Sequence, residues 1–405
     1  MPTATKNPNP PTSYKILLTV VCGIAFASYF ATSLRLPVVP LFAVSLGAST
    51  SEVGFINSSF LLMCGLLALP LGLLGDRWGR KRIILLGLLI ASSSSLLLYW
   101  SRTPLQIIWI YLAFGVGLAM IGPSLMAIVA DISPATHLGR AYGWYTTSIY
   151  SAMSLGPAAG GLLAEALGYR QVFLFVAGAM FLLLIPVAWF LPRSNPRADD
   201  HQLPDLSQVI SLGWSNHLLH GCWALTLGSC IALGVFFTFF PLYALRHGLN
   251  AGQIGVVFAA QAVINALSRI PLGRLSDQTD KTRLAIWGFL GLSLVLAAFS
   301  LSHSLTAFIV LAMASGAVQG VGFTPLGALI PEVVPVEARG LAMGGYNTAI
   351  YLGMMTGSAG MGPVIHLIGF EPSFFLAALI NLFFTGWFYL AFRRKSGGRG
   401  RIPAH

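Results

Sequence analysis

Charged and hydrogen-bonding side chains interrupt the long apolar stretches of this chain at few places, and Arg35 is the most prominent of them. Ser28, Thr32 and Arg35 recur at a spacing that would place them on one face of a helix. An ion inside an apolar segment is costly to bury and is therefore a candidate for function. Arg35 could hold an anionic or hydroxyl-rich group, and the alternative is that its side chain extends to the outer membrane interface.

A second polar stripe includes Gln261, Asn265, Ser268 and Arg269. Arg269 precedes Pro271 and a polar loop, which favours a gating role for this cation over a contact with substrate. Three further amides, at Asn57, Gln319 and Asn347, fall inside apolar segments. Such amides either offer hydrogen bonds to a cavity or hold helices together.

The sequence contains no set of residues with the pattern of a catalytic or metal centre. Cys22, Cys64, Cys222 and Cys230 all lie in apolar segments and lack the spacing of metal ligands, and we expect no disulfides among them. No nucleophile with a matching acid and base is recognisable, and no nucleotide-binding loop is present. We therefore expect neither an enzyme nor a metal or cofactor, and ATP-driven transport is disfavoured.

The elements that position these side chains are predicted to be membrane-spanning helices. Hydrophobic residues make up 56% of the 405 residues and charged residues only 9%, with a mean hydropathy of +0.78. No soluble surface accommodates this balance. The polar, proline-containing start of the chain has no short apolar stretch with a cleavage site, so we expect no cleaved signal peptide.

The net charge of +11 is explained by membrane orientation and does not require nucleic acid as a partner. With twelve spans and both termini inside, 18 of the 23 Lys and Arg residues fall on cytoplasmic segments. The outer loops hold Arg102, Arg170 and Arg246, and Arg35 and Arg269 lie within spans. The positive-inside rule then predicts an integral protein, of a bacterial inner membrane, with both termini cytoplasmic.

The chain is internally duplicated. PLGLLGD at residues 70–76 recurs as PLGRLSD at residues 271–277, an offset of 201 residues. The same offset joins Gly54 to Gly255, Gly115 to Gly316, Asp131 to Glu332, Tyr150 to Tyr351 and Gly156 to Gly357. A long fixed period indicates a repeated structural unit. In a membrane protein, two such halves are typical of a transporter whose site lies between them.

The apolar pattern predicts six helices in each half, with a six-helix bundle at residues 1–192, a cytoplasmic linker at 193–215 and a second bundle with a basic tail at 216–405. The predicted helices are 15–43, 51–75, 83–100, 105–131, 139–167, 171–191, 217–245, 252–275, 283–302, 306–332, 340–368 and 373–392. Glu165 and His366 are repeat partners at the outer ends of two of these helices. They are expected at the membrane interface, and the alternative is a protonatable outer gate.

The loop after the second predicted helix reads GLLGDRWGRK at residues 72–81. It resembles the signature loop of the major facilitator superfamily, with a match at Gly72, Asp76, Arg77, Gly79, Arg80 and Lys81. The second copy keeps Asp277 but has Asp280 and Lys281 at the positions of Gly79 and Arg80. The resemblance covers residues 15–392 and implies an all-α membrane protein of twelve helices in two pseudo-symmetric six-helix bundles.

The resemblance also implies that this loop is a conformational latch. The carboxylate of Asp76 is expected to meet the positive N-terminal end of the eleventh helix near Gly340. Arg80 is expected to pair with Asp131 at the end of the fourth helix. Such contacts form when the halves close on the cytoplasmic side, so they would favour an outward-facing state and would not bind substrate.

The fifth predicted helix, with GPAAGG at residues 156–161, resembles the glycine-proline motif of proton-coupled exporters. Ala152 departs from that motif, and Tyr111 stands where a related pattern of the fourth helix has arginine. Small residues and a proline bend would let such a helix pivot against a partner. The predicted gating residues are Gly143, Gly156, Pro157, Gly160 and Gly161, with Gly353 and Gly357 on the eleventh helix.

The family's first, fourth, seventh and tenth helices line a central cavity. The residues that we predict to line it here are Ser28, Thr32, Arg35, Asn57, Tyr111, Gln261, Asn265, Gln319 and Asn347. We therefore expect a monomeric secondary transporter that exports a small molecule in exchange for protons. The alternatives are an importer or uniporter of the same fold and, less favoured, a sensor or membrane enzyme.

Overall fold

The computed structural model of the chain describes residues 12–134, 137–192, 216–335 and 338–398, and this part of the chain contains helices and no strand. The first half contains α1 (Thr12–Ser45), α2 (Thr50–Trp78), α3 (Arg80–Trp100), α4 (Pro104–Ile132), α5 (Leu138–Leu167), α6 (Tyr169–Leu182) and α7 (Leu184–Phe190). The second half contains α9 (His217–Arg246), α10 (Ala251–Gln278), α11 (Lys281–Phe299), α12 (Leu305–Glu332), α13 (Arg339–Ile368) and α14 (Phe370–Gly398). The predicted linker at 193–215 lies outside the described residues.

These helices make the twelve spans that the sequence predicts, with α6 and α7 sharing one span. Ten spans of the described residues are long and apolar enough to cross a membrane by composition alone. The two exceptions are α5 and α13, whose glycines and hydroxyl residues lower their hydropathy. Each packs against one helix of its own half and one of the opposite half, and small residues suit such close packing.

Two details differ from the predicted helix bounds. The sixth span is broken at Leu183, because Pro186 has no N–H to donate to the carbonyl of Leu182 in a continuous helix. The last helix was expected to end at residue 392 and to be followed by a basic tail, but α14 continues to Gly398. Cationic side chains such as Arg393 stabilise the C-terminal end of a helix, and glycine ends it.

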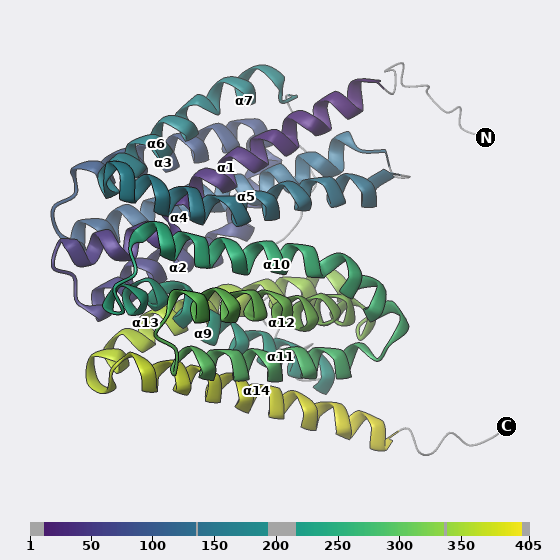
Figure 1. Cartoon of the computed structure of the whole chain (residues 1–405). Coiled ribbons are helices and arrows are strands. Elements are labelled where there is room, and N and C mark those ends of the chain that lie inside the picture. The colour runs from purple at the N-terminus through teal and green to yellow at the C-terminus, as the bar shows by residue number, and fades with distance from the viewer. Residues whose placement is uncertain (1–11, 135–136, 193–215, 336–337, 399–405) are drawn as a thin grey trace, which may run out of the picture.

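Helix packing follows the duplication. In the first half α2 packs on α4 and α1 packs on α5, and in the second half α10 packs on α12 and α9 packs on α13. The two halves lie one above the other in Figure 1 and meet along two equivalent pairs, α5 with α10 and α2 with α13. The structure is therefore two similar bundles related by a pseudo-two-fold axis.

The two ends of the bundle are named here from the chain. The terminus face carries the start of α1, the end of α14 and the turn at Gly79 between α2 and α3 (Figure 1). The far face carries the turns at residues 46–49, 101–103, 168 and 247–250. Helix caps at the far face repeat as well, because Ser49 and Asn250 each form a capping box at the start of α2 and α10.

The halves touch most closely toward the far face, through glycines that obey the repeat. A side chain at Gly54 would overlap the carbonyl of Ser358, and one at its repeat partner Gly255 would overlap the carbonyl of Pro157. Gly161 likewise packs on the backbone of Ala251. Backbones come this close in membrane proteins only where small residues allow it. We refer to these contacts, with Gly362 against Thr50 and Ser51, as the far-face gate.

Candidate functional site

A cavity of about 790 Å³ lies between the two halves. Its wall is built from α1, α2, α4 and α5 of the first half and from α9, α10 and α13 of the second half. This volume is within the range of sites that bind drug-sized molecules. Because both halves contribute to the wall, a change in their relative position would change access to the cavity.

Seven of the nine residues predicted to line the cavity do so. These are Ser28, Thr32, Arg35, Asn57, Tyr111, Gln261 and Asn347. Asn265 and Gln319 are not on the described wall. Asn265 donates to the carbonyl of Gly316 at 3.3 Å and accepts from Arg269 at 3.1 Å, and Gln319 donates to Ser315 at 2.9 Å. The Asn265 amide links α10 to α12, as the alternative interpretation of such residues proposed, whereas the Gln319 amide bonds within α12.

Arg35 is the cation of the cavity and is only 2% exposed. Its Nη1 donates to Ser95 Oγ at 3.2 Å, and the Tyr111 side chain is a second hydrogen-bonding neighbour of the guanidinium. Nε and Nη2 are fully buried and make no hydrogen bond of good geometry in the described part of the chain. The guanidinium lies 3.7 Å from the ring centre of Phe114 and 4.8 Å from that of Tyr111. These rings attract the cation but do not neutralise it. The side chain does not extend to the interface, because it is enclosed between α1, α3 and α4.

Tyr111 occupies the position at which the resembled exporter pattern has an arginine. In this structure the guanidinium of Arg35, from α1, lies over the Tyr111 ring on α4. The positive charge that the pattern places on the fourth helix is therefore supplied from the first helix at the same level of the bundle.

The hydroxyl groups of the predicted α1 stripe are already engaged as donors. Ser28 Oγ donates to the carbonyl of Ala25 at 3.0 Å, and Thr32 Oγ1 donates to the carbonyl of Ser28 at 2.9 Å. Asn57 donates to Thr238 of the second half at 2.6 Å. Arg35 is consequently the main source of free N–H donors on this side of the cavity.

Most of the cavity wall is apolar, and no aspartate or glutamate is among the described residues that line it. Aromatic and methionine side chains from both halves surround the polar groups, including Phe60, Phe114, Phe237, Phe258, Met153 and Met354. Phe237 and Phe258 come from the aromatic cluster of α9 and its neighbour α10, whose remaining rings, such as Phe236 and Phe240, are fully buried. Sequence reasoning missed most of these residues, because an aromatic side chain in a span carries no signal that separates a cavity wall from a core.

Hydrogen bonds also cross the far-face gate. Glu165 Oε1 accepts from Asn250 Nδ2 at 2.7 Å, and Thr50 Oγ1 donates to the carbonyl of Gly362 at 3.2 Å. Glu165 therefore lies at the contact of the two halves, although it is exposed, as is its repeat partner His366. On the other side of the cavity wall, Arg269 lies 4.3 Å from the ring centre of Tyr150 in the opposite half. None of these three contacts was predicted, since each depends on how the halves dock.

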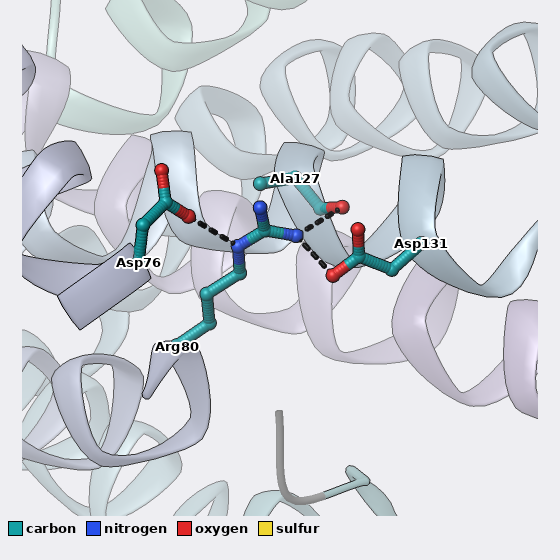
Figure 2. A network of polar contacts seen from close by, with 4 residues as sticks. All are labelled: Asp76, Arg80, Ala127 and Asp131. Carbon is teal, nitrogen blue, oxygen red and sulfur yellow. Dashed lines mark hydrogen bonds and ion pairs between the residues drawn. The ribbon is translucent and has the colours of Figure 1, made fainter. Parts of the chain in front are cut away.

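An ion-pair network occupies the terminus face at the predicted latch (Figure 2). Arg80 Nε donates to Asp76 Oδ1 at 2.8 Å, and its Nη1 donates to the carbonyl of Ala127 at 2.8 Å and to Asp131. Lys81 donates to the carbonyls of Ala188 and Leu191 at the end of the sixth span, at 2.6 and 2.9 Å. The network ties α2, α3 and α4 together within the first half.

Other latch residues are placed as follows. Arg77 is exposed at the end of α2. Gly79 has φ +97°, a backbone conformation that side chains rarely adopt, and this explains the glycine. The described contacts of Asp76 lie in its own half. Its meeting with the eleventh helix near Gly340 stays a prediction for a conformation closed at the terminus face.

The second copy of the loop keeps the ion pair although its sequence has diverged. Lys281 Nζ lies 2.6 Å from Glu332 Oε1, and these two residues are the repeat partners of Arg80 and Asp131. Asp280 replaces Gly79 and caps α11 by accepting from Thr282 N at 2.9 Å. A side-chain cap thus replaces the glycine turn. The side chain of Asp277 lies outside the described residues.

The predicted gating glycines divide into three groups. Gly156 and Gly160 pack on the backbone of α1, and Gly353 and Gly357 pack on α9, so these four hold helices together within one half. Gly161, with the carbonyl of Pro157, reaches across to α10. Gly143 has open space around it. Gly72 belongs to the predicted latch, and a side chain there would make ordinary contact with Pro123 at 3.6 Å. The role of each in gating stays a prediction.

Comparisons with known proteins agree with this architecture. The sequence profile of the Major Facilitator Superfamily matches residues 21–252 and, again, residues 222–404. The chain is 24% identical to an uncharacterized MFS-type transporter of Methanocaldococcus jannaschii, over 90% of this chain and 95% of that protein. It is 26% identical to the multidrug resistance protein MdtG of a Rahnella strain, over 95% of each protein.

Solved structures share the fold. A bacterial homologue of the human lysosomal transporter Spinster, in an inward-facing and occupied conformation, superposes with a TM-score of 0.80 at 14% identity, over 95% of this chain and 98% of that one. The nucleoside transporter NupG superposes with a TM-score of 0.78 at 14% identity, over 93% of this chain and 100% of that one. Duplicated six-helix halves, a cavity between them and a family profile that matches each half lead to one conclusion: the chain belongs to the major facilitator superfamily and is a membrane transporter of small molecules.

Proposed function

We propose that this transporter exports its substrate in exchange for protons, and that residues 1–192 and 216–405 move as two bodies around the cavity. The observation that supports alternating access is the far-face gate, where the two halves meet through close glycine contacts and through hydrogen bonds. Small polar and glycine contacts can be remade elsewhere at low cost. A rigid apolar interface could not be separated and remade at such low cost.

We place the terminus face in the cytoplasm, because Lys and Arg concentrate on the segments that reach it. The structure, closed at the far face, is then an inward-facing state, in keeping with the inward-facing relative of the same fold. Reactivity of a cysteine at Ser207 or His405 toward a membrane-impermeant maleimide tests this. Labelling in intact cells, where only the outer surface is accessible, would reverse the orientation.

Export is favoured by the relatives named for multidrug resistance, and proton exchange by the glycine-proline helix α5. Import has support as well, because a nucleoside transporter shares the fold. We also expect a monomer, because one chain supplies every described element of the cavity and of the gate.

The test of coupling is transport into proteoliposomes under an imposed proton gradient, across a compound panel. An exporter that exchanges protons should accumulate substrate on the side from which protons leave and should stop when a protonophore collapses the gradient. Equal rates with and without the gradient would instead indicate a uniporter. Accumulation together with protons would indicate an importer by symport.

A further inference from the structure

We propose that the cavity binds an amphipathic monoanion and that Arg35 is the group that holds its negative charge. This inference rests on the proposed transport function and names the class of substrate. It follows from three features of the cavity: an uncompensated cation, two hydroxyl groups of α1 that donate within their own helix, and an extended apolar wall.

The charge of Arg35 lacks a counter-ion. The side chain is 2% exposed and is the one cation among the described residues of the wall, which contain no carboxylate. A guanidinium stays protonated even when buried, so the charge persists. A cation held inside a membrane protein without a partner is costly, and in such places it marks a ligand site.

The two buried N–H groups of Arg35 suit a planar or tetrahedral anion. Nε and Nη2 are both without a partner, and a guanidinium presents such neighbouring N–H groups as a fork that binds two oxygens of one carboxylate, sulfonate or phosphate. The Phe114 ring at 3.7 Å and Ser95 at 3.2 Å hold the guanidinium in place from its other sides. The fork is thus fixed before a ligand arrives.

Two hydroxyls of the α1 stripe, Ser28 and Thr32, already donate elsewhere and cannot donate to an anion in place of Arg35. Ser28 and Thr32 direct their hydrogens to carbonyls of their own helix, which leaves only lone pairs toward the cavity. Lone pairs repel an anion but accept from hydroxyl or amine groups elsewhere on a ligand. One cation and no second fork indicate a single negative charge.

The remainder of the ligand faces apolar side chains from both halves, such as Phe60, Phe237 and Met354. An apolar body therefore accompanies the anionic group. A lipophilic cation of the same shape would meet the uncompensated charge of Arg35 and would be repelled. The cavity should discriminate by the sign of charge, which separates this proposal from a general preference for apolar drugs.

The test uses the full chain in nanodiscs and measures binding by isothermal titration calorimetry. The probes are 4-phenylbutyrate, 2-naphthylacetate and dodecanoate, each compared with its amide and with the corresponding primary amine. The naphthyl and phenyl probes represent soluble metabolites, and dodecanoate represents a lipid. We expect at least one acid to bind about 30-fold more tightly than its amide and amine, as for a buried charge that gains its partner.

Arg35→Gln should remove the preference of that acid over its amide, and Arg35→Lys should restore only part of it because the fork is lost. Arg246→Gln is the matched control: Arg246 also lies over a ring, that of Phe370 at 4.6 Å, but is absent from the cavity wall. The proposal is overturned if no acid binds more tightly than its amide and amine, or if Arg35→Gln keeps the preference.

Thermal unfolding shows whether Arg35→Gln is folded. If it is not, the comparison of acid, amide and amine on the unaltered chain decides by itself. Failure of the proposed function gives a different result. An acid that binds through Arg35 but is not moved across proteoliposomes would leave the site in place and contradict transport of this substrate class. Transport of amines but not of acids would support transport and contradict an anion site at Arg35.

Discussion

Replacement of Gly161 by alanine should open the far face. A Cβ at residue 161 would overlap the carbonyl oxygen of Ala251 and lie 3.0 Å from the Cα of Gly255, both backbone atoms of the opposite half. Backbone atoms cannot rotate away as the end of a side chain could. The halves must therefore separate locally to accommodate one methyl group.

Overpacking of this kind costs about 1–3 kcal/mol. The cost falls only on the state in which the far face is closed, so the ratio of closed to open molecules should fall by about 5- to 150-fold. Gly362→Ala should act similarly at the equivalent contact, where its Cβ would lie 2.7 Å from the Cα of Ser51. The two sites share no partner residue, so their effects should add in the double variant.

Distances between spin labels at Leu167 and Leu301 measure this equilibrium, because both residues are exposed and lie near the far face in opposite halves. The four native cysteines would first be replaced by alanine. Gly178→Ala is the matched control, since it makes the same change in open space on a helix of the same half. A distance distribution for Gly161→Ala that equals that of Gly178→Ala would refute the role of this contact in closing the far face.

Three further predictions concern the terminus face. Asp76→Asn should leave expression and substrate affinity nearly unchanged, because the Asp76 side chain is 31% exposed and its ion pair contributes at most about 1 kcal/mol to folding. The variant should nevertheless lose most transport, because the latch contact is lost. A variant with the transport rate of the unaltered protein would rule out the latch. Lys281→Glu should lower the thermal unfolding temperature slightly, and adding Glu332→Lys should recover it, since an exposed pair at 2.6 Å is worth up to about 1 kcal/mol; no recovery in the double variant would mean that the two charges do not interact. Gly79→Ala should destabilise the first half by about 1 kcal/mol or more, because φ at this residue is +97°. Unfolding at the same temperature as the unaltered protein would show that the turn relaxes freely. Asp280→Ala provides the comparison at the equivalent turn, where a side-chain cap worth about 1 kcal/mol is lost.

The sequence alone was sufficient to predict the number of spans, the duplication and the signature loop. Each of these depends on local properties: the length of an apolar run, a fixed offset between copies, or a short pattern of residue types. The helix bounds were predicted to within a few residues for the same reason. The errors occurred where a local feature was missed, as at the break before Pro186 and in the continuation of α14 to Gly398.

The second ion pair shows what packing adds. Lys281 and Glu332 were recognisable as repeat partners of Arg80 and Asp131, but the divergence of the loop suggested that this copy had decayed. The structure retains the ion pair at 2.6 Å, because α11 and α12 keep the spacing of α3 and α4. Conservation of geometry within the duplication was stronger than conservation of residue types.

The candidate site depended on tertiary structure to a greater extent. Arg35 and Asn265 are both polar residues on helical stripes, and the sequence treats them alike. Only docking of the helices shows that Asn265 is bonded within its own half, while Arg35 lies at the cavity wall with two buried N–H groups that lack a hydrogen bond. Whether a buried polar group is satisfied depends on residues far away in the chain, which a pattern along one helix cannot reveal. The sequence thus determined which residues are candidates, and the packing of the two halves decided which of them a substrate can reach.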